Sequence, residues 1–217
     1  MFYKDPHHIY RVPELDVLPW LEHGFGTRLV DVPARYANLA TLKQVHSATC
    51  VAAEGRTGVL GSGDALLENT PGSAVAIRTA DCIPLLLVDE RNRAVAAVHA
   101  GWRGTVAEIA RHAVDTMRER FGSHPADLHA AIGPGIGKCC YEVGPEVAAE
   151  FGQHGRAHID LVEANRRQLM DAGVTPLRIY ASNLCTMCRA EEFHSYRRDR
   201  EAAGRMYSFA GIRPAVQ

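Results

Sequence analysis

Three short apolar runs in the middle of the chain constrain its fold more than any other feature. Residues Ala74–Arg78, Leu85–Val88 and Ala94–Val98 are long enough for buried strands and too short for helices. The five charged or amide residues between the last two runs, 89–93, predict a turn. Strands joined by so short a turn, in a chain that also contains helices, predict α/β or α+β architecture with a mixed sheet rather than a purely parallel one.

Helical signals follow these strands. Thr105, with Glu108 three residues later, forms a capping box at the start of a predicted helix, and Gly122 is its predicted end. The remaining predicted elements are a strand at Leu128–Ile132, a loop at 133–137, a helix opening near Pro145, a helix capped by Asp160 and ending at Gly173, and strands at Leu177–Ala181 and Arg205–Ile212.

Composition narrows the class of protein. No repeat, low-complexity tract or linker interrupts the 217 residues, so we predict a single domain over residues 1–217. The formal net charge of −1 argues against nucleic acid and anionic membranes as partners. Residues 1–8 carry charges and a proline where a signal peptide needs an apolar run, and no stretch has membrane-spanning length. We therefore expect a soluble, cytoplasmic protein, either a monomer or a homodimer.

The chain contains six cysteines, which are Cys50, Cys82, Cys139, Cys140, Cys185 and Cys188. Disulfide-stapled folds are usually short and secreted, so we predict reduced thiols. The adjacent pair at 139 and 140 also fits poorly into a disulfide framework. A Cys-x-x-Cys motif by itself is weak evidence for zinc, and we predict a structural role for Cys185.

Three segments place a metal-binding side chain at an irregular point beside a predicted strand. They are KQVHS around His46, TADCIP around Cys82 and HAGWRG beginning at His99. Loops at strand ends are where α/β sheets place ligands. Two imidazoles and one thiolate suit Zn²⁺, and three protein ligands leave one position open, as in catalytic zinc sites. Spacing alone favours the alternative that Cys82 is a small core residue and that the histidines are hydrogen-bonded loop residues.

A set of motifs resembles the laccase-domain family, once called multicopper polyphenol oxidases and now regarded as purine nucleoside phosphorylases. The motifs run in the same order from HGFGTR at 23–28, through the three segments above, IGPGIG, CCYEVG and SYRRD, to GRM at 204–206. The resemblance implies that His46, Cys82 and His99 are metal ligands. It implies phosphorolysis of adenosine, guanosine, inosine and methylthioadenosine, with adenosine deamination as a second activity. The implied fold is a layered α/β/β/α sandwich with mixed sheets.

The older oxidase name predicts a different cofactor. Copper stands above zinc in the Irving–Williams order, so a His₂Cys site also suits copper. A multicopper oxidase, however, needs several copper ions, usually held by His-x-His pairs, and the sequence contains no His-x-His. We therefore rank a copper-dependent polyphenol oxidase below a zinc enzyme.

Phosphorolysis requires residues that bind phosphate and the purine. Arginine is the natural bidentate partner of phosphate, and Arg28 and Arg103 lie in the motif loops. Arg197 and Arg198 belong to SYRRD, where a structural ion pair is the more common role. Tyr141, and with it Trp102, offers an aromatic ring for the base, although such rings more often belong to the core.

Deamination needs a carboxylate that moves protons to the leaving ammonia. Asp64 and Asp81 are the candidates, and Asp81 alternatively orients a ligand histidine.

Two other functions use the same residues. In a cysteine hydrolase or amidase acting on cell-wall precursors, which some relatives' description as peptidoglycan editing factors implies, His99 would activate Cys82 as a nucleophile. A metal-binding adaptor would hold the ion without turnover.

Overall fold

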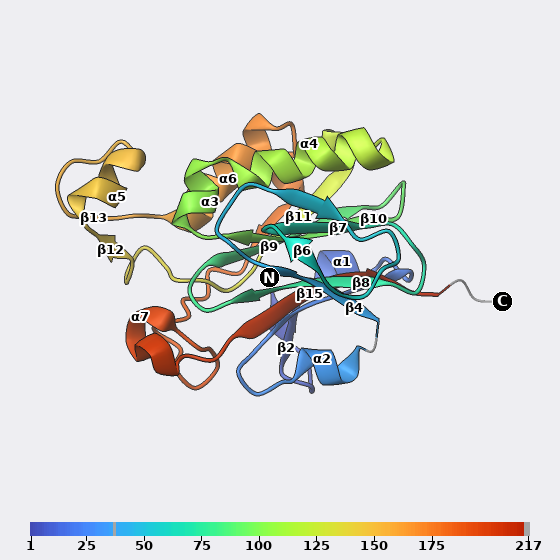
Figure 1. Cartoon of the computed structure of the whole chain (residues 1–217), viewed down its shortest axis with the longest axis horizontal. Coiled ribbons are helices and arrows are strands. Elements are labelled where there is room, and N and C mark those ends of the chain that lie inside the picture. The colour runs from blue at the N-terminus through green and yellow to red at the C-terminus, as the bar shows by residue number, and fades with distance from the viewer. Residues whose placement is uncertain (37, 215–217) are drawn as a thin grey trace.

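Two mixed β-sheets packed face to face form the centre of the protein (Figure 1). The computed structural model describes residues 1–36 and 38–214. The seven-stranded sheet has the order β1 (Tyr3–Lys4), β2 (Ile9–Arg11), β3 (Leu21–Gly26), β15 (Met206–Ile212), β8 (Ala74–Thr79), β4 (Leu39–Lys43) and β6 (Gly58–Ser62). The six-stranded sheet has the order β14 (Ile179–Ala181), β11 (Leu128–Ile132), β9 (Ile83–Asp89), β10 (Ala94–Ala100), β7 (Ala65–Glu68) and β5 (Cys50–Ala52).

Helices cover the outer face of the six-stranded sheet, and a thinner layer covers the other one (Figure 1). The helices are α1 (Pro13–Asp16), α2 (Val32–Arg35), α3 (Trp102–Val106), α4 (Ile109–Phe121), α5 (Pro145–Glu150), α6 (Leu161–Asp171) and α7 (Tyr196–Asp199). Short 3₁₀ turns occupy Pro125–Asp127, Pro176–Arg178 and Arg200–Ala202, and a separate ribbon pairs β12 (Glu142–Val143) with β13 (Ala157–His158). The predicted layered α/β sandwich with mixed sheets is confirmed.

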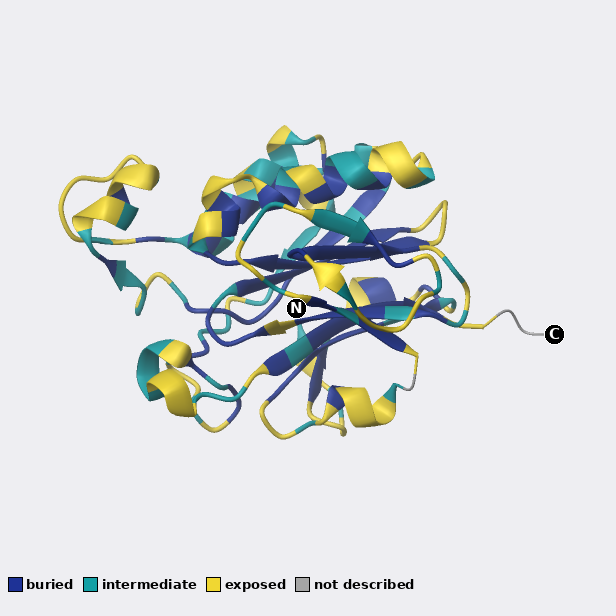
Figure 2. Ribbon diagram, viewed as in Figure 1, coloured by how far each residue is buried: buried dark blue, intermediate teal, exposed yellow. Residues whose placement is uncertain are grey.

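The strands β9 and β10 are buried on both faces, which explains their continuous apolar sequences. Leu85 and Leu87 of β9 face the helices, whereas Leu86 and Val88 face the seven-stranded sheet. Each fully buried leucine stabilises the fold by about 1.5–3 kcal/mol relative to exposure. Figure 2 shows the result as two sheets whose central strands are buried, between helices whose outer surfaces are exposed.

Most local predictions in this region are confirmed. The turn between β9 and β10 is held by Asp89, whose Oδ1 accepts hydrogen bonds from the backbone N–H groups of Arg91 and Asn92. Gly122 ends α4 in the left-handed conformation, and the Asp160 side chain caps α6.

Two predictions of element boundaries are wrong. The helix does not start at Thr105, because α3 already begins at Trp102 after Gly101, and Thr105 is buried within it. Its hydroxyl accepts a hydrogen bond from Asn165 of α6, and the left-handed Glu108 then separates α3 from α4. The predicted strand at 177–181 is a strand only from Ile179, because Pro176 opens a 3₁₀ turn. Within the described residues, no helix has both the length and the apolar character that a membrane span requires.

Candidate active site

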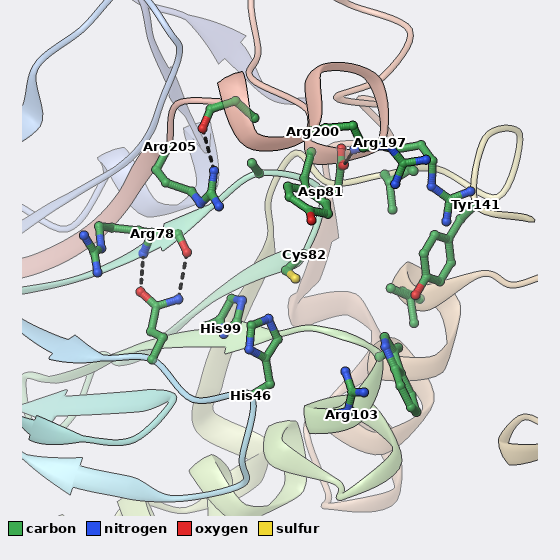
Figure 3. Close-up of a pocket in the computed structure, with 17 residues that line it drawn as sticks. His46, Arg78, Asp81, Cys82, His99, Arg103, Tyr141, Arg197, Arg200 and Arg205 are labelled. Carbon is green, nitrogen blue, oxygen red and sulfur yellow. Dashed lines mark hydrogen bonds between the residues drawn. The ribbon is translucent and has the colours of Figure 1, made fainter. Parts of the chain in front are cut away.

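His46, Cys82 and His99 converge at one end of the two sheets. Their ligand atoms all lie within 4.8 Å of one another, and Figure 3 shows the three side chains turned toward a common point. The two imidazole rings meet edge to face, with centroids 4.8 Å apart. His99 is buried, Cys82 is half-buried and His46 is exposed, so the cluster opens from a buried floor to a solvent-accessible rim.

The strand register brings these residues together. His99 pairs with Pro84 across β10 and β9, which places it beside the turn that carries Cys82. His46 follows β4 in the other sheet and adopts a positive φ of 59°. Gly101 lies so close that an added Cβ would stand 3.0 Å from both the Cys82 sulfur and the His46 ring. A side chain at position 101 would therefore push the cluster apart.

Asp64 holds the cluster from below and is fully buried. Its Oδ1 lies 2.8 Å from Nδ1 of His99 and accepts the backbone N–H of His46 at 3.0 Å. Its Oδ2 accepts hydrogen bonds from both the backbone and the hydroxyl of Ser47. Because Asp64 occupies Nδ1 of His99, the ring presents Nε2 to the cluster, as metal-binding histidines commonly do.

These contacts shift the pKa values of Cys82, His99 and Asp64. Burial raises the pKa of Cys82, but the hydrogen bonds from His46 and His99 outweigh it and lower this pKa to about 6. Burial lowers the pKa of His99, but the contacts with Asp64 and Cys82 raise it to about 9. Burial raises the pKa of Asp64, but the contacts with His99 and Ser47 lower it to about 2. At neutral pH the metal-free cluster therefore contains a thiolate beside an imidazolium.

Asp81 faces a different set of partners. Its carboxylate accepts hydrogen bonds from the Thr186 hydroxyl at 2.7 Å, the Ser195 hydroxyl at 3.1 Å and the backbone N–H of Arg197 at 2.6 Å. These bonds tie the turn before Cys82 to the segment around α7. The structure thus places Asp64, rather than Asp81, behind the ligand histidine.

A cavity of about 750 Å³ opens above the cluster. Its size lies in the range typical of small-molecule sites. Five arginines line it, whereas Asp81 is its single acidic lining residue among the described residues, and that carboxylate already binds three donors. The arginines are Arg78, Arg103, Arg197, Arg200 and Arg205 (Figure 3). Such a surface favours an anionic ligand.

Three of these arginines keep their guanidinium groups available. In residues 1–36 and 38–214, those of Arg78, Arg103 and Arg200 make no hydrogen bond to protein groups, and Arg103 stacks on the Trp102 ring at 4.2 Å. Arg205 instead donates to the carbonyls of residues 203 and 204. The first three can therefore bind an anion without losing a protein partner.

Tyr141 and Arg197 form one wall of the cavity. The Arg197 guanidinium lies 5.3 Å from the centre of the Tyr141 ring and donates to the Glu142 carbonyl at 2.8 Å. Burial and the nearby Cys82 raise the pKa of Tyr141 to about 12, so its hydroxyl stays protonated and can donate a hydrogen bond to a ligand.

Other predicted residues lie apart from the cavity. Arg28 does not line it, and its guanidinium donates to the Ala190 carbonyl at 2.7 Å. Arg198 holds the carbonyls of Thr186, Met187 and Phe193, which is a structural role. Arg78, Arg200 and Arg205 also line the cavity but were not predicted to do so. Arg78 directly precedes TADC, Arg200 directly follows SYRRD and Arg205 lies in GRM, and this proximity to the motifs was the available signal.

The donor set at the cluster suits a metal ion. Two imidazoles and a thiolate supply three ligands, Asp64 orients one of them, and the cavity leaves room for a fourth, exchangeable ligand. Elsewhere in the described residues, one further group of cysteines, histidines or carboxylates is arranged to hold an ion, and it contains no histidine. Neither group could seat a cluster of three copper ions.

Comparisons with known proteins show which family the chain resembles and which fold it shares. A family model described as "Multi-copper polyphenol oxidoreductase laccase" matches residues 27–213. The chain is 42% identical over 185 residues to a purine nucleoside phosphorylase of Deinococcus radiodurans, covering 81% of this chain and 70% of that protein. It is 40% identical over 163 residues to adenosine deaminase RL5 of an unknown prokaryotic organism, covering 69% of this chain and 61% of that protein. The crystal structure of YlmD from Geobacillus stearothermophilus superposes with a TM-score of 0.88 at 30% identity, covering 98% of both chains.

Proposed function

The chain belongs to the multi-copper polyphenol oxidoreductase laccase family, and on that premise we propose that it is a zinc-dependent purine nucleoside phosphorylase with adenosine deamination as a second activity. The observation that carries the proposal is the convergence of two imidazoles and one thiol, with ligand atoms within 4.8 Å of one another, at the floor of an arginine-lined cavity. Similar proteins carry the names purine nucleoside phosphorylase and adenosine deaminase, which supports the same substrate class.

His46, Cys82 and His99 are the residues that would hold the zinc ion, which when bound supplies Lewis-acid polarisation. Asp64 acts as a positioning residue because it contacts His99 and not the cavity. Because Asp64 does not line the cavity, the proton that reaches the leaving ammonia in deamination comes from a different group, one that does line the cavity.

In phosphorolysis, a phosphate oxygen forms a bond to C1′ of the ribose while the bond from C1′ to the purine nitrogen breaks. The purine leaves with the bonding electrons and takes up a proton. Arg78, Arg103 and Arg200 bind and orient the phosphate, because their guanidinium groups have no other hydrogen-bonding partner among the described residues. Tyr141 contacts the nucleoside as a protonated hydrogen-bond donor.

The direct test is an adenosine assay with and without phosphate. Adenine and ribose-1-phosphate formed only when phosphate is present identify the phosphorylase, and inosine formed without phosphate identifies the deaminase. Removal of zinc by a chelator should abolish both activities, and readdition of zinc should restore them. Absence of all three products from zinc-loaded protein would contradict the proposal.

A cysteine hydrolase or amidase is the second candidate, and one specific observation favours it. Cys82, His99 and Asp64 form a thiolate–imidazolium–carboxylate series in the metal-free protein. Chelation separates the two functions, because it should abolish phosphorolysis and preserve or increase hydrolysis by a free thiolate. A chelator-insensitive activity that requires Cys82 would therefore favour the hydrolase.

A further inference from the structure

Four cysteines that belong to two distant loops converge beside the cavity. Cys139 and Cys140 lie in the turn before Tyr141. After β14, Cys188 lies in a turn and Cys185 directly precedes that turn. All four sulfur atoms are within 4.8 Å of one another. The distances are 3.6 Å between Cys139 and Cys140, 3.4 Å between Cys140 and Cys188, and 3.8 Å between Cys139 and Cys188.

These distances match four ligands around one ion. A zinc–sulfur bond of about 2.3 Å in a tetrahedron separates neighbouring sulfurs by about 3.8 Å. The same sulfurs are too far apart for disulfides, in which bonded sulfurs stand about 2.0 Å apart. An iron–sulfur cube would need wider spacing, because each cysteine would bind a different iron.

The backbone around the cluster is arranged for sulfur ligands. The N–H of Gly137 donates to the Cys185 sulfur at 3.3 Å, a contact that stabilises a thiolate. A bridge between Gly135 and Cys185 aligns the two loops, with Thr186 N–H donating to the Gly135 carbonyl at 3.0 Å. A Cβ on Gly137 would come within 3.2 Å of the Cys139 sulfur. The loops are thus packed around the sulfurs themselves.

We propose that Cys139, Cys140, Cys185 and Cys188 bind a structural zinc ion, distinct from the ion at His46, Cys82 and His99. Four thiolates complete a tetrahedral shell and leave no position for a substrate or water, which is the arrangement of structural zinc. Each cysteine gives its proton to solvent as it binds. Zinc also protects Cys139 and Cys188, which are otherwise exposed thiols.

The position of this ion suggests what it stabilises. Cys140 directly precedes Tyr141 in the cavity wall, and the Arg197 guanidinium that stacks there also contacts the Cys140 carbonyl at 3.5 Å. On the other loop, Thr186 follows Cys185 and donates to Asp81 beside Cys82. The zinc therefore joins the two loops that position one wall of the substrate cavity.

Metal content tests the proposal independently of enzymatic activity. Protein purified with reductant and zinc should contain two zinc equivalents per chain by mass spectrometry of the elements. Cys188→Ser should retain one equivalent, Cys82→Ala should retain the other, and the double variant should retain none. Cys50→Ser is the matched control, because Cys50 belongs to neither cluster, and it should keep both.

Cobalt substitution provides a second measurement on the unaltered four-cysteine cluster. Sulfur-to-cobalt charge-transfer absorption scales with the number of thiolate ligands, of which the wild type would have five. The Co²⁺-loaded Cys82→Ala protein should therefore keep about four fifths of that absorption. This reading does not depend on whether Cys188→Ser folds.

Kinetic measurements then test whether the structural ion stabilises the cavity wall. Of the three experiments, only this one rests on the proposed function. Cys188→Ser should raise the KM for adenosine about threefold to tenfold and change kcat less than about twofold, because Tyr141 binds substrate and the reacting centre is intact. The proposal would be overturned if the wild-type protein contained a single zinc ion and the Cys82→Ala protein contained none. It would also be overturned by iron at the cluster, or by disulfides among the four cysteines of protein kept under reductant.

Discussion

The two sulfur-containing clusters differ in the types of residue they contain, in the number of those residues and in their access to the cavity. His46, Cys82 and His99 would supply three ligands at the floor of a cavity, whereas the cluster of Cys139, Cys140, Cys185 and Cys188 would supply four sulfurs beside it. Three ligands leave a vacancy for chemistry, and four close the shell. On our proposals, the three-residue cluster therefore holds a reactive ion and the four-cysteine cluster a structural one, and the two differ in both the number and the type of converging side chains.

The clusters also differ in their supporting residues. At the three-ligand site, the buried carboxylate of Asp64 contacts a histidine ligand. At the four-cysteine cluster, a backbone N–H of Gly137 takes that role and no carboxylate does so among the described residues. A carboxylate raises the basicity of an imidazole ligand, whereas thiolates already carry the charge that zinc requires.

The largest expected effect comes from removing one ligand of the three-ligand site. Cys82→Ala should reduce phosphorolysis roughly a thousandfold or more, since it removes a charged ligand worth several kcal/mol of transition-state stabilisation. The fold should remain, because zinc at an open site is not the main support of the two sheets. Steady-state assays and circular dichroism measure the two results, with Cys50→Ala as the control. Near-normal turnover by Cys82→Ala would remove this cluster from the reaction.

Asp64→Asn should weaken the same site without emptying the other. Loss of the charge behind His99 is expected to reduce zinc affinity about 10–100-fold. Titration with a competing chelator measures this, and saturating zinc should restore most of the kcat. Equal loss of zinc from the four-cysteine cluster would instead indicate general unfolding.

Arg103→Ala tests whether the cavity above the three-ligand site binds phosphate. Losing one charge-assisted contact of about 1.5 kcal/mol should raise the KM for phosphate about tenfold and leave the zinc content unchanged. The control is Arg118→Ala, since Arg118 does not line the cavity and pairs with Asp115 on the exposed surface of α4. An unchanged phosphate dependence would exclude Arg103 from the anion site.

The smallest effect concerns thiol reactivity in metal-free protein. The lowered pKa of Cys82, about 6, means that its reactive thiolate grows about fivefold from pH 5 to 6 and less than about twofold from pH 6 to 7. Burial raises the pKa of Cys50, so its alkylation should keep increasing about tenfold per pH unit. Peptide mapping after brief alkylation separates the two. A Cys82 profile like that of Cys50 would contradict the thiolate–imidazolium pair.

The local fold was predictable where hydrophobic pattern and caps act within a few residues. The apolar runs that became β8, β9 and β10 and the cap at Asp160 are of this kind. The strands β1 to β7 were not predicted. Most of them are short, and β1 and β6 are largely exposed, so their sequences lack the continuous apolar run that marked β8, β9 and β10. Thr105 misled the helix prediction, because its hydroxyl bonds across to α6 instead of capping its own helix.

The candidate site was predictable only in part. Family motifs identified His46, Cys82 and His99, but Arg78 and Arg200 look like ordinary surface arginines in the sequence. Their selection depended on the path of the chain around the cavity, since the pocket-lining segments come from both sheets and from α7.

By itself, the sequence determined which segments are strands buried on both faces, because continuous apolar runs must be removed from water wherever they lie. It also determined which cysteines and histidines are present as potential metal ligands. Only the tertiary structure decided which of these side chains lie within reach of one ion, because Cys140 and Cys188 stand 48 positions apart and meet through the bridge between Gly135 and Cys185. Burial is a property of each segment, whereas coordination requires that distant side chains reach one point.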